Sequence, residues 1–188
     1  ISVSGSLFRK KEHGGLGKYK TSDYDGVVKT AMTPDLLYDD FTDIWIPHPI
    51  DTEGCFLTSA KGDVSSLLHS PTNKNIKNTE FIVGVMRGVS KIMGCDMFVT
   101  SGVGHDSSVS MKSHATVFFD QAGVGFYGNS AIEAMRYGVP VAAWISDYAR
   151  KRGGNVMGRC PVLSWGLKRK EWVDGIVRVL NGVMIGYM

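Results

Sequence analysis

Two stretches of this 188-residue sequence carry residue types and spacings that could bind an anionic ligand. In one of them, Gly128, Asn129 and Ser130 follow an apolar run and open a short predicted helix. A glycine-rich turn before a helix offers free backbone N–H groups and the positive end of the helix dipole, which suit a phosphate. Glu133 lies one helical turn past Asn129, so we expect its carboxylate to point to the same place and accept hydrogen bonds from two ribose hydroxyls. Such turns and acids also serve structure alone, and both interpretations stay open here.

The other stretch, SSLLHSPTNKNIKNTEF, places polar side chains where a predicted strand gives way to a long helix. The strand ends near His69, and the following loop carries Asn73, Lys74 and Lys77. Open parallel sheets bind ligands beyond the carboxyl ends of their strands, so these lysines could neutralise a diphosphate, with His69 lining the cleft. Lysines at a helix start are also commonly just solvated, and that alternative remains.

Short β-branched runs alternate with amphipathic segments along the chain, which is typical of a parallel sheet flanked by helices. The predicted fold class is therefore α/β, with a Rossmann-like parallel sheet. Asp120 and Gln121 follow one of the strands, and we expect them to orient loops around the ligand. Strands are predicted at 1–6, 26–32, 43–47, 65–70, 96–101, 116–120 and 139–145, helices at 79–93, 130–137 and 171–184, and loops at 9–25 and 101–109.

A segment dense in turn-forming residues, PHPIDTEGCFLTSAKGD, fits a connection between two structural units. We place the domain boundary there, with a partial domain over residues 1–50 and a complete one over 51–188. Because the chain begins at Ile1 and opens directly into a predicted strand, it is expected to be a fragment of a longer protein.

Composition narrows the classes of function. A net charge of +3 without a dense Lys/Arg stripe argues against nucleic-acid binding. Three cysteines, Cys55, Cys95 and Cys160, have no metal-ligand spacing, and their odd number favours a reducing, cytoplasmic setting. No apolar run is long enough to span a membrane. The glycines match neither the GxGxxG fingerprint nor the GxxxxGK[ST] phosphate loop, which disfavours dehydrogenases and P-loop NTPases.

The stretch FYGNSAIEAMRYGVPV resembles the G-x-S-x-x-E-A-M-x-x-G-x-P-V signature of group 1 glycosyltransferases, which have the two-domain GT-B fold. HSPTNKNIKNT is similar to the first loop of that family's donor domain, where an N-[RK]-x-x-K-G-T motif contacts the donor phosphates. DIWIPHPID resembles the strand that leads into the interdomain linker, and VSGSLFR resembles an H-G-S-x-x-R strand of the acceptor domain. The chain would then hold the donor-binding domain and the last part of the acceptor domain.

This resemblance implies a retaining transfer of a sugar from a nucleoside-diphosphate sugar, UDP- or GDP-linked, to an unknown acceptor. Glu133 would bind the donor ribose, and residues 128–130 would meet the phosphates or the sugar. Lys74 and Lys77 would stabilise the leaving nucleoside diphosphate, so that neither a metal ion nor a cofactor is expected. A missing half-domain would leave apolar surface exposed, which suggests a possible homodimer.

The sequence departs from the family pattern at four positions. Gly125 stands where an acidic residue is common, Lys74 where Arg is commoner, Asn78 where Gly is usual, and Ser4 where the strand motif carries His. Two other functions therefore stay open. One is a nucleotide-sugar-binding module without turnover, and the other is a flavodoxin-like binding or signalling domain whose glycines serve only turns.

Overall fold

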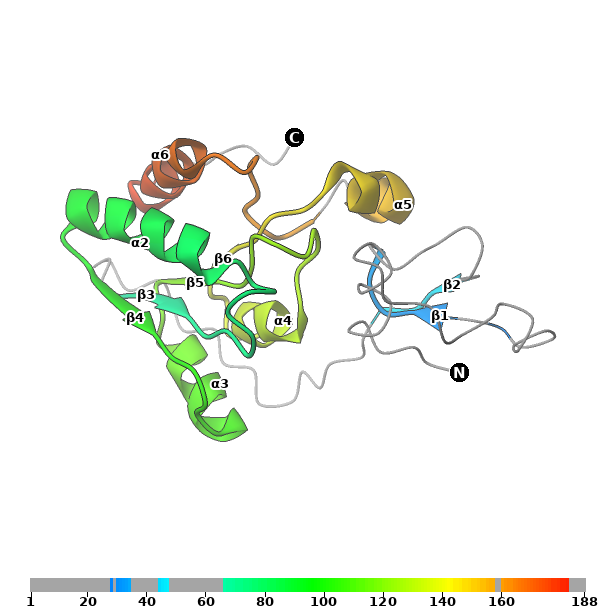
Figure 1. The fold of residues 1–188 in the computed structure, drawn as a ribbon, viewed down its shortest axis with the longest axis horizontal. Coiled ribbons are helices and arrows are strands. Elements are labelled where there is room, and N and C mark those ends of the chain that lie inside the picture. The colour runs from blue at the N-terminus through cyan, green and yellow to red at the C-terminus, as the bar shows by residue number, and fades with distance from the viewer. Residues whose placement is uncertain (1–27, 29, 35–43, 48–65, 158–159, 183–188) are drawn as a thin grey trace.

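The structure, a computed structural model, describes residues 28, 30–34, 44–47, 66–157 and 160–182 (Figure 1). The strand predicted at 1–6, the loop predicted at 9–25 and the domain boundary predicted at residue 50 lie outside these residues. Strands β1 (Thr30–Ala31) and β2 (Ile44–Trp45) fall within two of the predicted strands and pair in parallel.

The main sheet has four strands, and all of its pairings are parallel. Its order is β4-β3-β5-β6, so the first strand of the sheet lies inside it and the chain crosses over to reach β5. The strands are β3 (Ser66–His69), β4 (Asp96–Val99), β5 (Val117–Phe119) and β6 (Val141–Ala142). The α/β class with a parallel sheet flanked by helices, predicted from the alternation of apolar runs, is confirmed.

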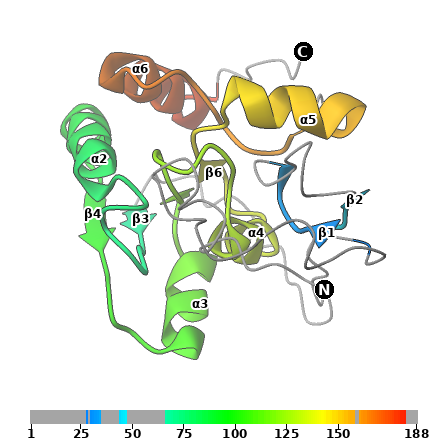
Figure 2. The same cartoon turned by 45° about the vertical axis from the view of Figure 1, so that its right-hand side comes forward.

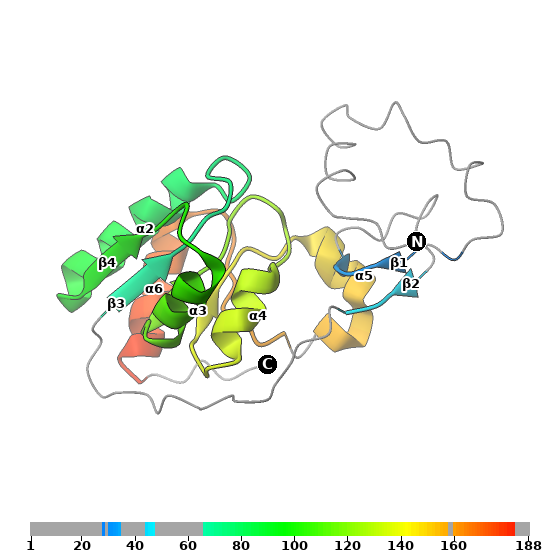
Figure 3. The ribbon, with the colours of Figure 1, turned by 90° about the horizontal axis from the view of Figure 1, so that it is seen from below.

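Helices cover both faces of this sheet because successive strand residues point to opposite sides. Leu67 and Phe119 pack into one core with α2 and α6, whereas Leu68 and Phe118 pack into the other with α4. Figures 2 and 3 show α2 and α6 on one side of the sheet and α3 and α4 on the other. The helices are α2 (Thr79–Met93), α3 (His105–Ser113), α4 (Asn129–Met135), α5 (Asp147–Met157) and α6 (Arg169–Leu180).

Three of these helices were predicted from sequence. Helix α2 has the predicted bounds and ends where Gly94 adopts a left-handed conformation and donates its N–H to Ser90 O. Helix α4 begins one residue earlier than predicted, and α6 covers 169–180 where 171–184 was expected. None of the helices among the described residues is both long and apolar enough to cross a membrane.

Two helices were not predicted. The segment 101–109 was expected to be a loop throughout, but α3 begins at His105. Its sequence, HDSSVSMKS, lacks the apolar periodicity that marks an amphipathic helix, so the prediction of a loop was wrong there. Helix α5 contains Gly153 and Gly154, and the backbone of Gly154 is non-helical, which explains why no helix was expected.

Candidate functional site

The loops that follow β3 and β5 meet at the carboxyl edge of the sheet, because these two strands are neighbours. The backbone N–H of Ala122 donates to Lys77 O at 3.0 Å, and the Asn78 side-chain amide donates to Ala122 O at 3.2 Å. Asn78 has a φ of 52°, in the left-handed region that favours glycine and tolerates asparagine. Its presence where the family pattern has Gly is therefore compatible with the backbone, and its side chain adds a link between the loops.

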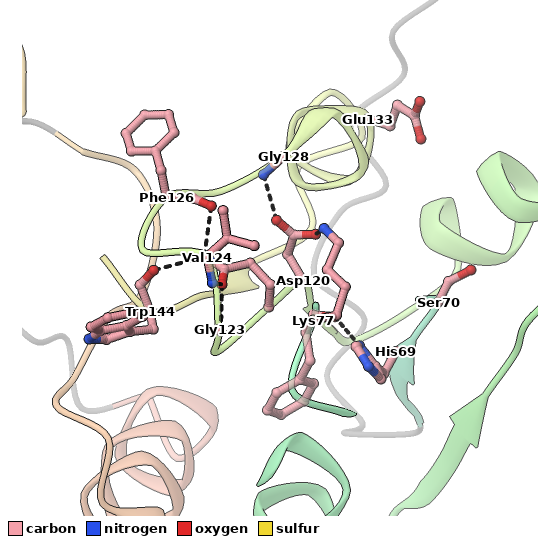
Figure 4. Close-up of polar contacts among 12 residues, drawn as sticks. His69, Ser70, Lys77, Asp120, Gly123, Val124, Phe126, Gly128, Glu133 and Trp144 are labelled. Atoms are coloured by element: carbon pink, nitrogen blue, oxygen red, sulfur yellow. Dashed lines mark hydrogen bonds and ion pairs between the residues drawn. The ribbon is translucent and has the colours of Figure 1, made fainter. Parts of the chain in front are cut away.

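An ion pair lies where these loops meet. Lys77 Nζ is 2.5 Å from Asp120 Oδ1, and the backbone N–H of Gly128 donates to Asp120 Oδ2 at 2.6 Å (Figure 4). The side chain of Lys77 is 15% exposed and that of Asp120 is 1% exposed. A Cβ atom at residue 128 would lie 3.2 Å from Lys77 Nζ, so glycine allows the two loops to approach this closely. Lys77 and Gly128, which the sequence placed in two separate motifs, are thus brought together by Asp120.

Gln121 fixes the shape of the loop that leads from β5 to α4. Its side-chain amide donates to Phe126 O at 2.7 Å and to Trp144 O at 2.8 Å. Its Oε1 accepts the backbone N–H groups of Gly123 and Val124, at 2.8 and 2.7 Å. All four contacts involve a side chain that is fully buried, so the loop has one well-defined path (Figure 4). This agrees with the expectation that Gln121 orients a loop.

Glu133 does not join Lys77. Its carboxylate is paired with Lys112 of α3, with 2.6 Å between Lys112 Nζ and Glu133 Oε2. Figure 4 shows the Glu133 side chain on the α3 side of α4, away from the contact between Gly128 and Asp120. Sequence reasoning missed Lys112, because it lies in a segment without helical periodicity. No local sequence signal pairs Lys112 with Glu133, because the two residues lie 21 positions apart and meet only when α3 packs on α4.

The remaining predicted residues occupy different environments at the same edge. Lys74 is exposed and has no ion pair among the described residues. Asn73 Oδ1 accepts the backbone N–H groups of residues 75 and 76, and so forms the turn that carries Lys74. Asn129 is exposed and Ser130 is half-buried at the start of α4.

His69 is buried at the end of β3, with its two ring nitrogens in hydrogen bonds. Nδ1 lies 2.8 Å from Phe119 O, and Nε2 lies 3.0 Å from Thr79 Oγ1. Burial lowers the pKa of His69 below its ordinary value of 6.5, and the nearby Lys77 acts in the same direction, while the hydrogen bond to Phe119 and the Asp120 charge oppose it. The ring therefore ties α2 to β5 instead of facing solvent. Within the described part of the chain, no three His, Cys, Asp or Glu side chains gather closely enough to hold a metal ion.

No protein-family model matches this chain, and no curated protein matches it in sequence. Among solved structures, one described as a GtfA/B complex matches with a TM-score of 0.53 at 11% identity, over 88% of this chain and 40% of that one. A glycotransferase of kitacinnamycin matches with a TM-score of 0.46 at 13% identity, over 93% of this chain and 52% of that one.

The first of these likenesses establishes the fold. This chain shares with that structure an α/β fold centred on a parallel sheet that is flanked by helices. The chain spans 40% and 52% of the lengths of the two structures it matches.

Proposed function

We propose that this chain is the donor-binding part of a glycosyltransferase that transfers a sugar from a nucleoside-diphosphate sugar to an acceptor. The observation that carries the proposal is the meeting of the two predicted phosphate-binding loops at Lys77, Asp120 and Gly128. These loops come from neighbouring parallel strands, and ligands of open α/β sheets bind beyond the carboxyl ends of such strands. The fold shared with the structure described as a GtfA/B complex is compatible with the same assignment.

The positive charge available to a diphosphate is divided unequally between the two lysines. Asp120 already neutralises Lys77, whereas Lys74 stands exposed on the loop after β3 with no ion pair among the described residues. Lys74 would therefore supply most of the net attraction for the phosphates, and Lys77 would supply a fixed N–H donor beside Gly128. Both would stabilise the negative charge that develops on the leaving nucleoside diphosphate.

Glu133 would accept hydrogen bonds from the ribose hydroxyls, and Asn129 and Ser130 would lie next to the phosphates or the donor sugar. Asn73 would hold the turn that presents Lys74. His69 would hold the start of α2 against β5 through its contacts with Thr79 and Phe119. A retaining, metal-independent reaction in the cytoplasm, with UDP or GDP as the nucleotide, completes the proposal. It rests on the resemblance of the motifs around Lys77 and Glu133 and on the cysteine usage of the chain.

The alternative is a nucleotide-sugar-binding module without turnover. Its specific support is that every ligand contact assigned to the candidate site would be to the donor, and none to an acceptor. A two-domain transferase needs acceptor-side residues that a donor domain alone does not supply. Binding without hydrolysis or transfer of the donor sugar would be its signature, and self-association into a homodimer is testable in the same samples by light scattering.

Calorimetric titration with UDP, GDP and ADP, in EDTA and then in magnesium, tests the site. We expect one nucleotide to bind selectively and with equal affinity in both buffers. The Lys74→Met variant should bind several-fold more weakly, because an uncompensated cation at a phosphate contributes directly to affinity. Lys91→Met is the matched control, since Lys91 is also exposed but lies in the last turn of α2.

Incubation with UDP-glucose and GDP-mannose then separates the two functions. Slow release of free sugar would support the enzyme, whereas tight binding without release would support the module. Equal affinities of the Lys74→Met and Lys91→Met variants, or no binding of any of the three nucleotides, would contradict the proposed site.

A further inference from the structure

Lys112 is a buried cation that the proposed reaction does not yet use. It lies near the end of α3 with its side chain 2% exposed. Its ammonium contacts the Glu133 carboxylate at 2.6 Å and lies 5.7 Å from the centre of the Phe118 ring. Phe118 belongs to β5, so Lys112 connects α3, the sheet and α4 at a single point.

Stability alone does not favour a lysine at this position. Removing an ammonium group from water costs several kcal/mol, and a buried ion pair recovers that cost only with good geometry. An apolar residue such as methionine would pack against Phe118 without this cost. What a buried pair does provide is a fixed position for each charged group. Here the fixed group is the carboxylate of Glu133.

The Glu133 carboxylate is held by one oxygen and remains partly open to solvent. Lys112 binds Oε2, and the side chain of Glu133 is 27% exposed. Other polar groups lie along α3, the helix that carries Lys112. Ser70 Oγ, at the end of β3, is 3.4 Å from Ser108 Oγ of α3. Figure 4 shows Glu133 and Ser70 on the α3 side of the site. A ligand with two neighbouring hydroxyls could meet Glu133 Oε1 here without displacing Lys112.

We infer that Lys112 is a positioning residue, which holds the Glu133 carboxylate in one orientation so that it accepts hydrogen bonds from the ribose diol of the nucleotide. This inference rests on the proposed function, because it needs a nucleoside diphosphate whose phosphates lie near Lys74 and Lys77. It adds a consequence that the proposed function lacks: discrimination between ribose and deoxyribose depends on Lys112 of α3 as well as on Glu133.

The experiment compares each nucleoside diphosphate with its 2′-deoxy form by calorimetry: UDP with dUDP, GDP with dGDP, and ADP with dADP. A hydrogen bond to a charged group is worth about tenfold or more in affinity, so the wild-type chain should prefer the ribose form by about that factor. In Lys112→Met the preference should fall at least threefold, while the affinity for inorganic pyrophosphate changes less than twofold. Lys91→Met should keep the wild-type preference.

Lys112→Gln covers the case in which the methionine variant does not fold, because its amide can still donate to Glu133 and should give an intermediate preference. An unchanged ribose preference in a folded Lys112 variant would overturn the inference and leave the proposed function standing. Wild-type binding of UDP, GDP or ADP with no ribose preference would overturn the inference together with the ribose-binding role of Glu133, and would leave the phosphate-binding site at Lys74 and Lys77 standing. Failure of the wild-type chain to bind any of the three would overturn both.

Discussion

Lys77 Nζ and Asp120 Oδ1, which belong to residues 43 positions apart in the sequence, lie 2.5 Å from each other at the carboxyl edge of the sheet. The pair joins the loop before α2 to the loop before α4. Because Asp120 also accepts the N–H of Gly128, one buried carboxylate sets the distance between both halves of the candidate site. The integrity of the site and the stability of the fold are therefore expected to depend on the same contact.

Replacing Lys77 by methionine should destabilise the protein by about 3–5 kcal/mol, because it leaves the buried Asp120 charge without its partner. The double variant Lys77→Met/Asp120→Asn should be more stable than Lys77→Met alone. Urea denaturation followed by circular dichroism measures both. Lys170→Met is the control, since Lys170 Nζ and Asp174 Oδ2 are also 2.5 Å apart but that pair is exposed and should be worth less than about 1 kcal/mol. Equal losses for Lys77→Met and Lys170→Met would contradict a structural role for the buried pair.

Gly123→Ala should force the two loops apart. A Cβ atom at residue 123 would lie 2.5 Å from Ile76 O, a backbone atom that cannot rotate away. We expect a loss of about 1–3 kcal/mol in stability, as for other overpacked sites, and weaker nucleotide binding. Gly104→Ala is the matched control, because a Cβ atom there meets nothing within 4 Å and the φ of −60° suits alanine. Equal stability of the two variants in thermal denaturation would contradict the close approach of residue 123 to Ile76 O.

Gln121→Glu changes one group of a buried side chain from a hydrogen-bond donor to an acceptor. The new carboxylate oxygen would face Phe126 O and Trp144 O, both of which now accept from the amide. Leaving these carbonyls unpaired beside a buried charge should cost at least about 3 kcal/mol. The exposed Asn75→Asp substitution makes the same chemical change in solvent and should be near neutral. Denaturation midpoints that shift by the same amount in both variants would argue against the role of Gln121 in the loop.

Stability should fall in mild acid because of His69. Burial lowers its pKa in the folded state, so below about pH 6.5 the unfolded chain binds a proton that the folded chain does not. The contribution is complete above pH 6.5 and is lost as the pH falls toward the lowered pKa, with a slope of at most about 1.4 kcal/mol per pH unit. Urea titrations between pH 7.5 and 5.5 should show a shallower pH dependence for His69→Gln than for the wild-type chain. Parallel curves would show that His69 does not carry this dependence.

The sequence predicted the sheet and α2 because their signals are local. Helix α2 has a strong apolar periodicity and a terminal glycine, and the strands of the main sheet are short, mainly apolar runs. Helix α3 has neither signal. Its place in the fold comes from contact with α4 and from the buried stem of Lys112, which only the folded chain reveals.

The candidate site was predictable in its parts but not in its contacts. Strand-end reasoning placed Lys77 and Gly128 at one edge and pointed to Asp120 and Gln121 as loop-orienting residues. It could not show that Asp120 pairs with Lys77, since both loops had to be positioned first. The Glu133 carboxylate also points in a different direction from the one expected. Its position on α4 allows contact with the loop before that helix, but in the structure it pairs with the buried ammonium of Lys112 on α3.

Gln121 has one more consequence, which concerns entropy. The loop at residues 122–126 takes its shape from hydrogen bonds between the Gln121 side chain and four backbone groups of the protein itself. Ordering a flexible loop on binding commonly lowers affinity, because the chain loses conformational freedom at that moment. In this protein the freedom of residues 123 and 124 is already lost during folding. A ligand that meets this loop therefore encounters a preorganised surface, and its affinity should reflect the contacts it makes with little reduction for immobilising the backbone.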